Sequence, residues 1–296
     1  MSIEATVIAD SISTNGQRII TFHLRYPRFI HAEFLTHRQH SRNSSSSRAI
    51  PMRKFVKDIR NDPATFVHWG KNQPGMSAQE ELSGWRLYAT KKIWLTGMWV
   101  STFLANLADR VGAHKQIGNR IIEPYCHMST VMTATDLSNF YALRRHPDAQ
   151  PEIRALADAM YVAQNSSTPV LLNEGEWHLP FITEEDRQQA KSAPAISIRA
   201  MEDDLKTKFA ISDELIALIG VSVARCARTS YSLHNGAATT YDKDFALYQR
   251  LLGSVPIHAS PAEHIATPDP SNKFQNLHGN FSGYVQYRKM LPGECQ

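Results

Sequence analysis

Two runs near the N-terminus limit the range of folds more than any other part of the sequence. Residues 3–10 and 18–25 are rich in β-branched and aromatic side chains, and Asn15-Gly16 lies between them. Asn-Gly suits a tight hairpin turn because both residues tolerate positive φ. We therefore predict two antiparallel strands. Pro27 then ends the second strand, and residues 29–37 are predicted to be helical.

The middle of the chain predicts a long helix. Five large apolar side chains recur at every fourth position, namely Leu95, Trp99, Phe103, Leu107 and Val111. This spacing places them along one side of a helix. We expect the stripe to face a hydrophobic core. The tryptophans of this region are expected to be packing residues: Trp85, Trp94 and Trp99.

Two further helices are predicted downstream. Thr135-Asp136 can cap a helix that runs to Arg144, because both side chains can accept a hydrogen bond from a backbone N–H. Pro151 suits the first turn of the next helix. The predicted buried face of that helix consists of Ile153, Leu156, Ala157 and Met160. Residues 184–212 are charged and rich in Ala and Ser, so they are predicted to form a peripheral connection before apolar order resumes at 215–231.

The composition is that of an ordinary globular protein. The 296 residues are 42% hydrophobic and 20% charged, and this length suffices for one large domain or two small ones. The three cysteines (Cys126, Cys226 and Cys295) include no CxxC pair, so neither a disulfide framework nor a zinc site is expected. No leader-like apolar run opens the sequence, and no stretch approaches the roughly 20 apolar residues of a membrane span. We therefore expect no metal, no membrane partner and a cytoplasmic location.

The strongest chemical signal is a basic, serine-rich segment at residues 33–48. It contains four consecutive serines, 44–47, set between arginines. Nine basic residues fall between Arg18 and Lys57 against a single acid, Glu33, whereas the whole chain carries only +4. Guanidinium groups and small hydroxyls together suit a phosphate group. A solvated basic loop would have the same composition, so both interpretations stay open.

This segment resembles the signature of the flavin-dependent thymidylate synthases, the ThyX family. That signature is an Arg-His-Arg triplet followed, seven residues on, by a serine. Here the triplet reads Thr36-His37-Arg38, and the serine is Ser46. The family's Ser-x-Asn-x-x-Ser-x-Arg pattern is matched by Ser41, Asn43, Ser46 and Arg48.

Further blocks carry the same resemblance. Residues 139–144 and 149–153 are similar to the family's Asn-Phe-x-x-Leu-Arg and Ala-Gln-x-Glu-Ile. Residues 119–124 resemble its Arg-x-x-Leu-Pro segment, with a glutamate in place of the leucine. Residues 223–231 and 258–264 resemble its Ala-Ala-Arg-x-Ser-Phe and His-x-Thr-Pro-x-Glu-His blocks. In the family these two blocks precede the triplet, so the order here is permuted, an arrangement that closely placed termini permit.

The resemblance implies a fold and a function. The implied fold is α+β, with a central, mainly antiparallel sheet and long packed helices. Residues 1–160 would hold the signature loop and the nucleotide-binding helices, and residues 213–296 the flavin-binding segment, so that 1–296 is one catalytic domain. The implied activity is FAD-dependent methylation of dUMP to dTMP at C5, with methylenetetrahydrofolate and NADPH as co-substrates. Active sites shared between the subunits of a homotetramer are implied as well.

The resemblance also assigns roles to residues. Arg144 is the predicted catalytic residue, because its cation would stabilise negative charge that develops on the pyrimidine. The predicted substrate contacts are Glu33, Ser44, Ser46, Ser47, Arg48, Arg120 and Arg144. The predicted FAD contacts are Thr36, His37, Arg38, Asn139, Ser230, His258 and Ser260. Glu263 and His264 are predicted to hold the turn that carries His258.

Three departures from the family pattern leave the substrate open. Thr36 replaces an arginine, Ser44 replaces an acid, and Glu33 stands where a glutamine is common. Cytosine presents an acceptor at N3 and a donor at N4, where uracil presents the reverse, so a relocated carboxylate favours dCMP. Methylation or hydroxymethylation of dCMP is therefore the alternative to dUMP methylation.

Two interpretations from other classes compete with this one. Residues 124–127, Pro-Tyr-Cys-His, resemble the Pro-Cys-His of the cysteine-dependent thymidylate synthases, which would make Cys126 a nucleophile. A nucleic-acid-binding module would use the basic segment, but that segment lacks interleaved aromatic residues, and no nucleic-acid partner is expected. The aromatic and basic run 280–290 either lines a co-substrate entrance or packs on the core.

Overall fold

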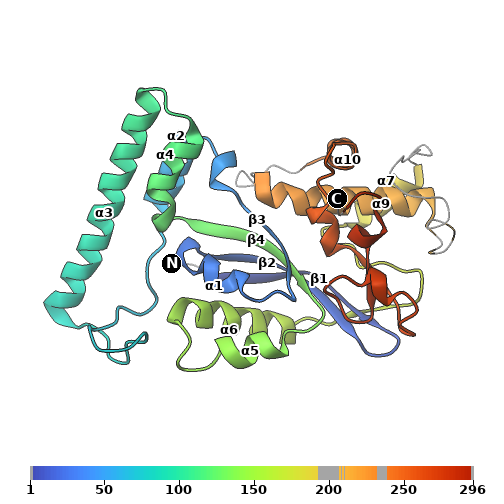
Figure 1. Ribbon diagram of the computed structural model, residues 1–296, viewed down its shortest axis with the longest axis horizontal. Helices are drawn as coiled ribbons and strands as arrows, with labels where there is room; N and C mark the ends of the chain where they lie inside the picture. Colours follow the sequence, from blue (N-terminus) through green and yellow to red (C-terminus); the bar gives the residue numbers. More distant parts are fainter. Residues whose placement is uncertain (1–2, 193–206, 208, 210, 232–238, 295–296) are drawn as a thin grey trace.

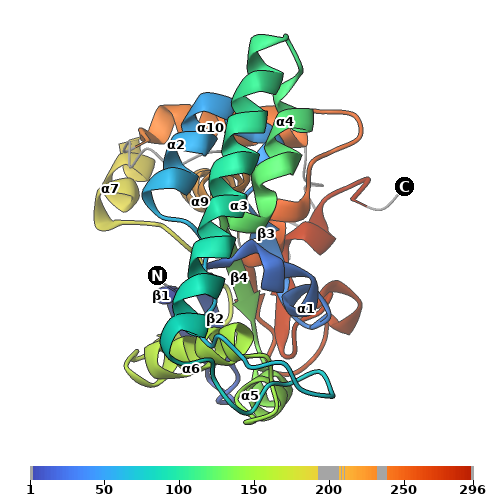
Figure 2. The same cartoon turned by 90° about the vertical axis from the view of Figure 1, so that its left-hand side faces the viewer.

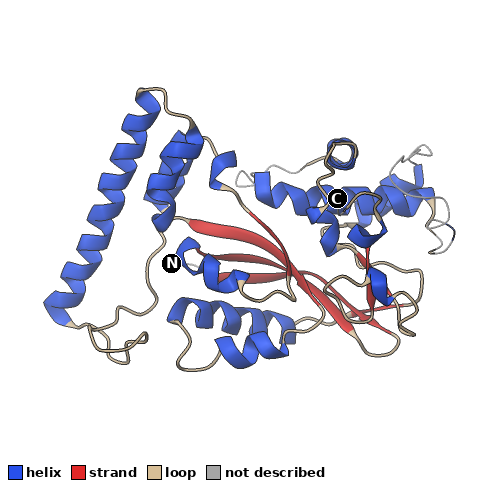
Figure 3. Ribbon diagram, viewed as in Figure 1, coloured by secondary structure: helices blue, strands red, loops and turns tan. Residues whose placement is uncertain are grey.

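A five-stranded mixed sheet of order β3-β4-β2-β1-β5 forms the centre of the molecule (Figures 1 and 3). The computed structural model describes residues 3–192, 207, 209, 211–231 and 239–294, without the side chains of Ser192, Ser230 and Tyr231. The strands are β1 (Glu4–Ser13), β2 (Arg18–Pro27), β3 (Ser41–Ser44), β4 (His127–Ala134) and β5 (Val170–Leu172). Antiparallel pairing joins β1 to β2, β2 to β4 and β4 to β3, whereas β5 pairs parallel with β1. The prediction of an α+β fold with a mainly antiparallel sheet is confirmed.

The predicted hairpin builds the first half of this sheet. β1 pairs with β2 from Glu4–Arg25 to Ile12–Arg18. Gly16 in the connecting turn has a φ of 84°, a conformation that most side chains disfavour. The chain then leaves β2 through η1 (Arg28–Ile30) and α1 (His31–Leu35), which confirms the helix predicted there.

One face of the sheet is covered by α5 (Ser138–Arg144) and α6 (Pro151–Asn165), which lie below it in Figure 1. The N-cap of α5 is Leu137, one residue beyond the predicted cap, and Asp136 Oδ1 accepts a hydrogen bond from the Ser138 N–H at 2.8 Å just before the helix. The residues predicted to be buried on α6 are all fully covered: Ile153, Leu156, Ala157 and Met160. They belong to one cluster with Phe22 and Leu24 of β2. Burial of each large aliphatic side chain contributes about 2 kcal/mol.

The C-terminal part of the chain lies on the other side of the sheet (Figure 1). Its helices are α7 (Glu184–Ser192), α9 (Asp213–Tyr231) and α10 (Tyr241–Leu252). They are followed by η5 (Ser260–His264), β6 (Ala266–Pro268), η6 (Gln275–Leu277), β7 (Tyr284–Gln286) and η7 (Tyr287–Met290). Both α9 and η5 contact β3 and β4.

Two sequence expectations meet the structure in this part. The run 280–290 packs on the core, because Tyr284 and Tyr287 are fully buried. Of the predicted peripheral connection, residues 184–192 form α7 and contact α9, whereas most of residues 193–212 lie outside the described part of the chain.

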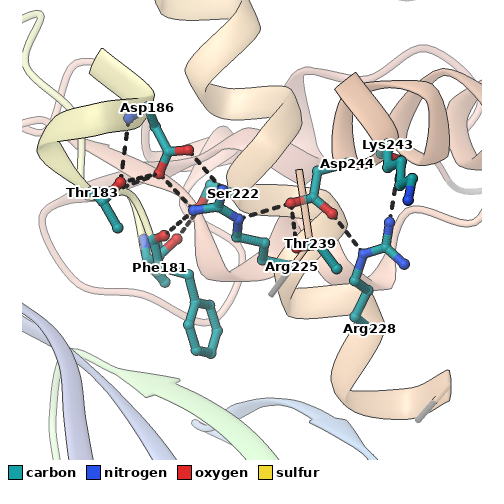
Figure 4. Close-up of polar contacts among 10 residues, drawn as sticks. Phe181, Thr183, Asp186, Ser222, Arg225, Arg228, Thr239, Lys243 and Asp244 are labelled. Carbon is teal, nitrogen blue, oxygen red and sulfur yellow. Dashed lines mark hydrogen bonds and ion pairs between the residues drawn. The ribbon is translucent and has the colours of Figure 1, made fainter. Parts of the chain in front are cut away.

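A buried ion network ties α7, α9 and α10 together (Figure 4). Arg225 of α9 donates to Asp186 of α7 at 2.6 and 2.7 Å and to Asp244 of α10 at 2.9 Å. Arg228, one turn on, donates to the other oxygen of Asp244 at 2.6 Å, and Thr239 Oγ1 donates to Asp244 at 2.7 Å. The Asp244 side chain is fully buried. The network therefore fixes the three helices relative to one another.

Asp244→Asn should destabilise the protein by about 3 kcal/mol. The change keeps the shape of the side chain but removes its negative charge, so the buried Arg225 guanidinium retains only one carboxylate partner, Asp186. The free energy of unfolding in urea measures the effect. Asp242→Asn, at an exposed position of the same helix, is the matched control and should change stability by less than about 0.5 kcal/mol. Equal stability of Asp244→Asn and the parent would contradict this role of the network.

A second buried polar chain lies between the sheet and the C-terminal part. His178 Nε2 is 2.8 Å from Thr21 Oγ1, which is 2.7 Å from Thr133 Oγ1. His264 Nδ1 is 2.8 Å from the same Thr133 hydroxyl. Burial lowers the pKa of both His178 and His264 to about 3, so both imidazoles are neutral in the folded protein.

We expect the free energy of unfolding to fall as the pH falls below about 6.5, the usual pKa of histidine in an unfolded chain. Between that value and the folded pKa, the unfolded state binds more protons, so acid favours unfolding. At pH 5 the loss is about 2 kcal/mol for each of His178 and His264. Urea unfolding at neutral pH and at pH 5 measures this loss. The exposed His146→Gln variant is the control, and its free energy of unfolding should differ between the two pH values by the same amount as that of the parent. Equal stability at the two pH values would contradict the prediction.

Three helices form the remaining part, and α3 stands away from the sheet in Figure 1 and lies in front of it in the view of Figure 2. They are α2 (Met52–Asn61), α3 (Gly84–Arg110) and α4 (Lys115–Ile122), together with η2 (Ser47–Ala49) and η3 (Glu123–Tyr125). Their shared core includes Phe55, Met98, Ala105 and Ile122. No helix among the described residues has both the length and the apolar character that crossing a membrane requires.

The long helix α3 is confirmed, but the prediction that its apolar stripe faces a core is wrong. The buried residues of α3 are Met98, Thr102 and Ala105. Most of the predicted stripe is exposed: Trp99 by 52%, Phe103 by 61%, Leu107 by 45% and Val111 by 75%. The core role expected of Trp85 is also wrong, since it is 76% exposed, whereas Leu95 and Trp94 are half-buried. Since α2 and α4 are the helices packed against α3, only a narrow side is covered and the large apolar residues face outward.

Candidate active site

Arg144 meets the signature segment. It lies in the last turn of α5, where its Nε donates to His37 Nε2 at 2.9 Å. Its Nη2 lies 3.3 Å from Thr36 Oγ1. The structure therefore brings the predicted catalytic residue together with two predicted flavin contacts. We call these three residues the Arg144 cluster.

His37 is held as a neutral acceptor. An arginine only donates, so His37 Nε2 accepts and the ring proton sits on Nδ1. Burial, followed by the charges of Arg144 and Arg42, lowers the pKa of His37. His40 stacks beside it at a centroid distance of 5.6 Å, and burial lowers the pKa of His40 to about 3. Phe140 of α5 packs edge-on against the rings of His37 and His40 and so fixes the position of both.

The corner between α1 and β3 is fixed by Arg42. Its Nη1 donates to the Phe34 and His37 carbonyls at 3.0 and 2.9 Å. The side chain is half-buried, and this burial lowers its pKa. Arg42 is therefore a structural arginine, a role that the sequence did not separate from that of neighbouring Arg38.

The serine run is built into the sheet edge. Ser44 Oγ accepts from Thr130 Oγ1 at 2.9 Å, and Ser45 Oγ accepts from the Ser129 N–H at 3.1 Å. Ser46 is half-buried and, among the described residues, its hydroxyl has no hydrogen-bond partner. Ser44 and Ser45 thus hold the loop to β4, whereas the Ser46 hydroxyl is not engaged by any described residue.

Glu123 organises the far end of the loop. It accepts a hydrogen bond from Ser47 Oγ and pairs with Arg120 at 3.1 Å and Arg28 at 3.3 Å. Asn119 Nδ2 donates to the Ser47 carbonyl at 2.7 Å. We call Arg28, Ser47, Arg120 and Glu123 the Glu123 cluster. The predicted substrate contacts Ser47 and Arg120 are engaged within it. In the sequence, Glu123 is marked only by its departure from the family pattern, where a leucine is usual.

Arg38 and Arg48 keep their charges available. Both side chains are exposed, and within the described ranges neither has an ion-pair or hydrogen-bond partner. Asn139, in the first turn of α5, is also exposed. These three predicted contacts are therefore free to bind an anionic or polar ligand.

Glu33 has a covered carboxylate oxygen with no partner. Its Oε2 makes no hydrogen bond to any described residue. Glu33 lies in α1, and the Thr36 hydroxyl donates to its carbonyl at 2.7 Å. An unsatisfied covered oxygen of this kind costs about 1–3 kcal/mol. A ligand that donates a hydrogen bond there would recover this energy.

The C-terminal segment reaches the beginning of β3. Gln286 Nε2 donates to Ser41 Oγ and to the Glu263 carbonyl, both at 3.2 Å. Asn280 Nδ2 donates to the Gln39 carbonyl at 2.8 Å. These bonds place the 258–264 block beside the signature segment.

Within that block the predicted residues differ in their environment. His258 and Ser260 are exposed. Glu263 pairs with Arg288, and His264 is fully buried in the polar chain described above. The Ser230 side chain lies outside the described part of the structure.

Cys126 is a poor candidate nucleophile. It is buried at the start of β4, and burial raises the pKa of its thiol to about 12. A covered, neutral thiol lacks the thiolate character that nucleophilic catalysis requires. The cysteine-dependent interpretation is therefore disfavoured.

The candidate site has two parts at opposite ends of β3. Thr36 and His37 of the Arg144 cluster come just before β3 begins at Ser41. The loop with Ser46 and Arg48, whose Ser47 belongs to the Glu123 cluster, begins after β3 ends at Ser44. One part offers a cation held by a neutral histidine, and the other offers an exposed arginine and a free hydroxyl.

Comparison with known protein families finds no match, and comparison with curated protein sequences finds none. Among solved structures, the chain is similar to a UMP/dUMP methylase, PolB from Streptomyces cacaoi, bound with 5-Br dUMP. The two are 15% identical with a TM-score of 0.47, over 55% of this chain and 89% of that one. The same methylase bound with 5-Br UMP is 17% identical with a TM-score of 0.44, over 55% of this chain and 88% of that one.

Proposed function

We propose that this protein is a flavin-dependent methyltransferase of the ThyX type, which converts dUMP to dTMP with methylenetetrahydrofolate and NADPH. The hydrogen bond between Arg144 and His37 carries the proposal, because it joins two blocks of family resemblance that lie far apart in the sequence. The contact of η5 with β3 supports the proposal, because it brings a third block of family resemblance, residues 258–264, against the strand of the signature segment.

Arg144 suits the charge that methylation generates. Attack by C5 of a pyrimidine on the one-carbon unit requires electron density to move through the base, and a cation at the base edge stabilises it. His37 engages Arg144 through Nε and Thr36 lies against Nη2, which orients the guanidinium and leaves Nη1 for the substrate. Because His37 is neutral, it does not reduce the charge that Arg144 presents to the base.

The residues around the Arg144 cluster fit a flavin dinucleotide. Bound FAD would supply the redox chemistry that protein side chains lack. Asn139 and Ser260 are exposed and offer neutral donors for the ring and the ribityl chain, whereas the Thr36 hydroxyl already donates to the Glu33 carbonyl and could only accept. Arg38 offers an uncommitted cation for the diphosphate. His37, with its proton on Nδ1, offers one further donor.

We further propose that a second copy of the chain completes each site within a homotetramer. In one chain β3 separates the Arg144 cluster from Ser46 and Arg48. The exposed apolar residues of α3 supply a surface for association, since monomeric proteins rarely leave such a large apolar face uncovered. Assembly through α3 would let Arg48 of one copy bind the phosphate of a nucleotide that lies on Arg144 of another.

The decisive assay offers the nucleotides separately. Protein supplied with FAD and NADPH is incubated with methylenetetrahydrofolate and either dUMP or dCMP, and the products are weighed by mass spectrometry. The proposal expects a yellow protein and dTMP from dUMP. Failure to bind FAD, or absence of product from both nucleotides, would overturn it.

One observation favours dCMP as a second candidate substrate. The covered Oε2 of Glu33 needs a donor, and the N4 amino group of cytosine can supply one at the position where uracil has a carbonyl, while uracil offers only its N3–H. If dCMP is the substrate, Glu33→Gln should shift the ratio of kcat/KM for dCMP and dUMP toward dUMP by at least about tenfold, since an amide can serve both partners. The exposed Glu4→Gln is the control and should leave the ratio unchanged. An unchanged ratio in Glu33→Gln would remove Glu33 from base recognition.

A further inference from the structure

A large cavity lies between the sheet, α2 and the α7–α9–α10 group. Its volume is about 1620 Å³, and none of the predicted site residues with described side chains lines it. Pockets for small organic molecules usually measure about 300–1,000 Å³, so the space is ample for one. We call it the sheet–helix cavity.

The sheet side of this cavity carries a polar group. Arg25 Nη2 donates to Asp62 Oδ2 at 2.5 Å and to His127 Nδ1 at 2.9 Å. Because arginine only donates, His127 carries its proton on Nε2, and that N–H has no partner among the described residues. Burial, followed by the Arg25 charge, lowers the pKa of His127 to about 4, so the ring is a neutral donor.

Part of the lining is apolar and aromatic, beside neutral polar residues such as Asn61, Gln189 and Gln249. Phe55 of α2, Phe181 before α7 and Phe245 of α10 contribute rings from three sides, and Ile8 and Ile50 add aliphatic surface. Such a lining favours a ligand with a flat apolar body, because ring faces and edges pack well against it.

Among the described residues that line the cavity, the charges are predominantly negative. The two lining arginines are paired with acids: Arg25 with Asp62, and Arg225 with Asp186. Three further carboxylates stand at the exposed rim, on Asp58, Glu185 and Asp242. Asp58 is paired with Lys54 at 3.1 Å, and no described residue forms an ion pair with Glu185 or Asp242. An excess of carboxylates repels phosphates and the glutamate tail of a folate, and attracts cations.

We infer that the sheet–helix cavity binds a small organic cation with an aromatic body, at a site separate from the nucleotide site. The aromatic body packs among Phe55, Phe181 and Phe245, and the positive charge faces the carboxylates of the rim. An acceptor on the ligand receives the free His127 N–H. This binding does not depend on the methyltransferase proposal, because the two sites share no residue.

Two dyes of opposite charge test the inference. Thioflavin T, a flat aromatic cation, is titrated into the full-length protein, and 8-anilinonaphthalene-1-sulfonate, an aromatic anion, is titrated in parallel. Saturable fluorescence is expected from thioflavin T, with an affinity at least about tenfold above that of the anion. Addition of dUMP should not displace the cation. No thioflavin T binding, or tighter binding of the anion, would overturn the inference.

Two sets of variants place the dye in the cavity. Asp58→Asn combined with Asp242→Asn should weaken thioflavin T binding about tenfold, since the two changes remove two of the rim charges that attract the cation. Ala246→Trp, which fills the cavity from α10, should abolish binding, whereas Arg250→Trp at an exposed position of the same helix should not. If thioflavin T still binds to Ala246→Trp with the parent's affinity, it lies elsewhere, for example on α3, and the inference fails. If Ala246→Trp does not fold, an unchanged affinity in the Asp58/Asp242 double variant has the same meaning.

Discussion

Arg144→Ala should lower kcat for pyrimidine methylation by at least about 100-fold, because it removes the cation that stabilises charge on the base, an interaction of about 3 kcal/mol in the transition state. The fold should survive. Arg144 is only half-buried, and its loss leaves the His37 acceptor open to water, so the free energy of unfolding should change by about 1 kcal/mol or less. Single-turnover kinetics and urea unfolding measure the two quantities.

The neighbouring arginine provides the matched control. Arg145 is bonded to Asp158 at 2.7 Å and lies over the Tyr161 ring at 3.7 Å, pointing away from the signature segment. Arg145→Ala should therefore keep the parent's turnover. Arg144→Lys retains the charge but cannot keep both the Nε bond and the planar fork, so its kcat should lie between those of the parent and the alanine variant. If Arg144→Ala turns over like the parent, the assigned role is wrong.

Local patterns predicted those parts of the fold that local chemistry determines. The hairpin follows from a turn dipeptide between two β-rich runs, and the buried face of α6 follows from the spacing of four apolar residues. The same kind of pattern failed on α3. Periodicity states which side chains share a side of a helix, but not which element covers that side. The residues of α3 that are buried are Met98, Thr102 and Ala105, none of which belongs to the predicted stripe.

The candidate site divides in the same way. Family resemblance identified both Arg144 and His37, and the structure brings them into contact. Neither resemblance nor spacing revealed that Glu123 engages Ser47 and Arg120, because the choice of ion-pair partner depends on tertiary packing. The Arg225 network was missed for the same reason, since Asp186 and Asp244 lie on two other helices.

Charges placed on the exposed apolar face of α3 should disrupt both assembly and activity. Val100→Glu combined with Phe103→Glu should convert the protein to monomers and abolish methylation at the same time, because two carboxylates cannot be buried without partners in an apolar interface. Both side chains are exposed in the single chain, by 53% and 61%, so the monomer itself should keep its fold. Light scattering after gel filtration measures the mass, and the dUMP assay measures activity. Val100→Thr with Phe103→Tyr, which adds no charge, should keep both assembly and turnover.

Mixed assemblies then test whether two copies share one active site. Arg144→Ala chains and Arg48→Ala chains should each be inactive alone, the first for lack of charge stabilisation and the second for weak binding of the nucleotide phosphate. If one copy supplies Arg144 and another supplies Arg48, co-expressed hybrids contain sites in which both arginines are intact. Random assembly in equal amounts makes these roughly a quarter of all sites, so about a quarter of the parent's activity should return. Sites built within a single chain would give no recovery, because every chain in the mixture lacks one of the two guanidinium groups.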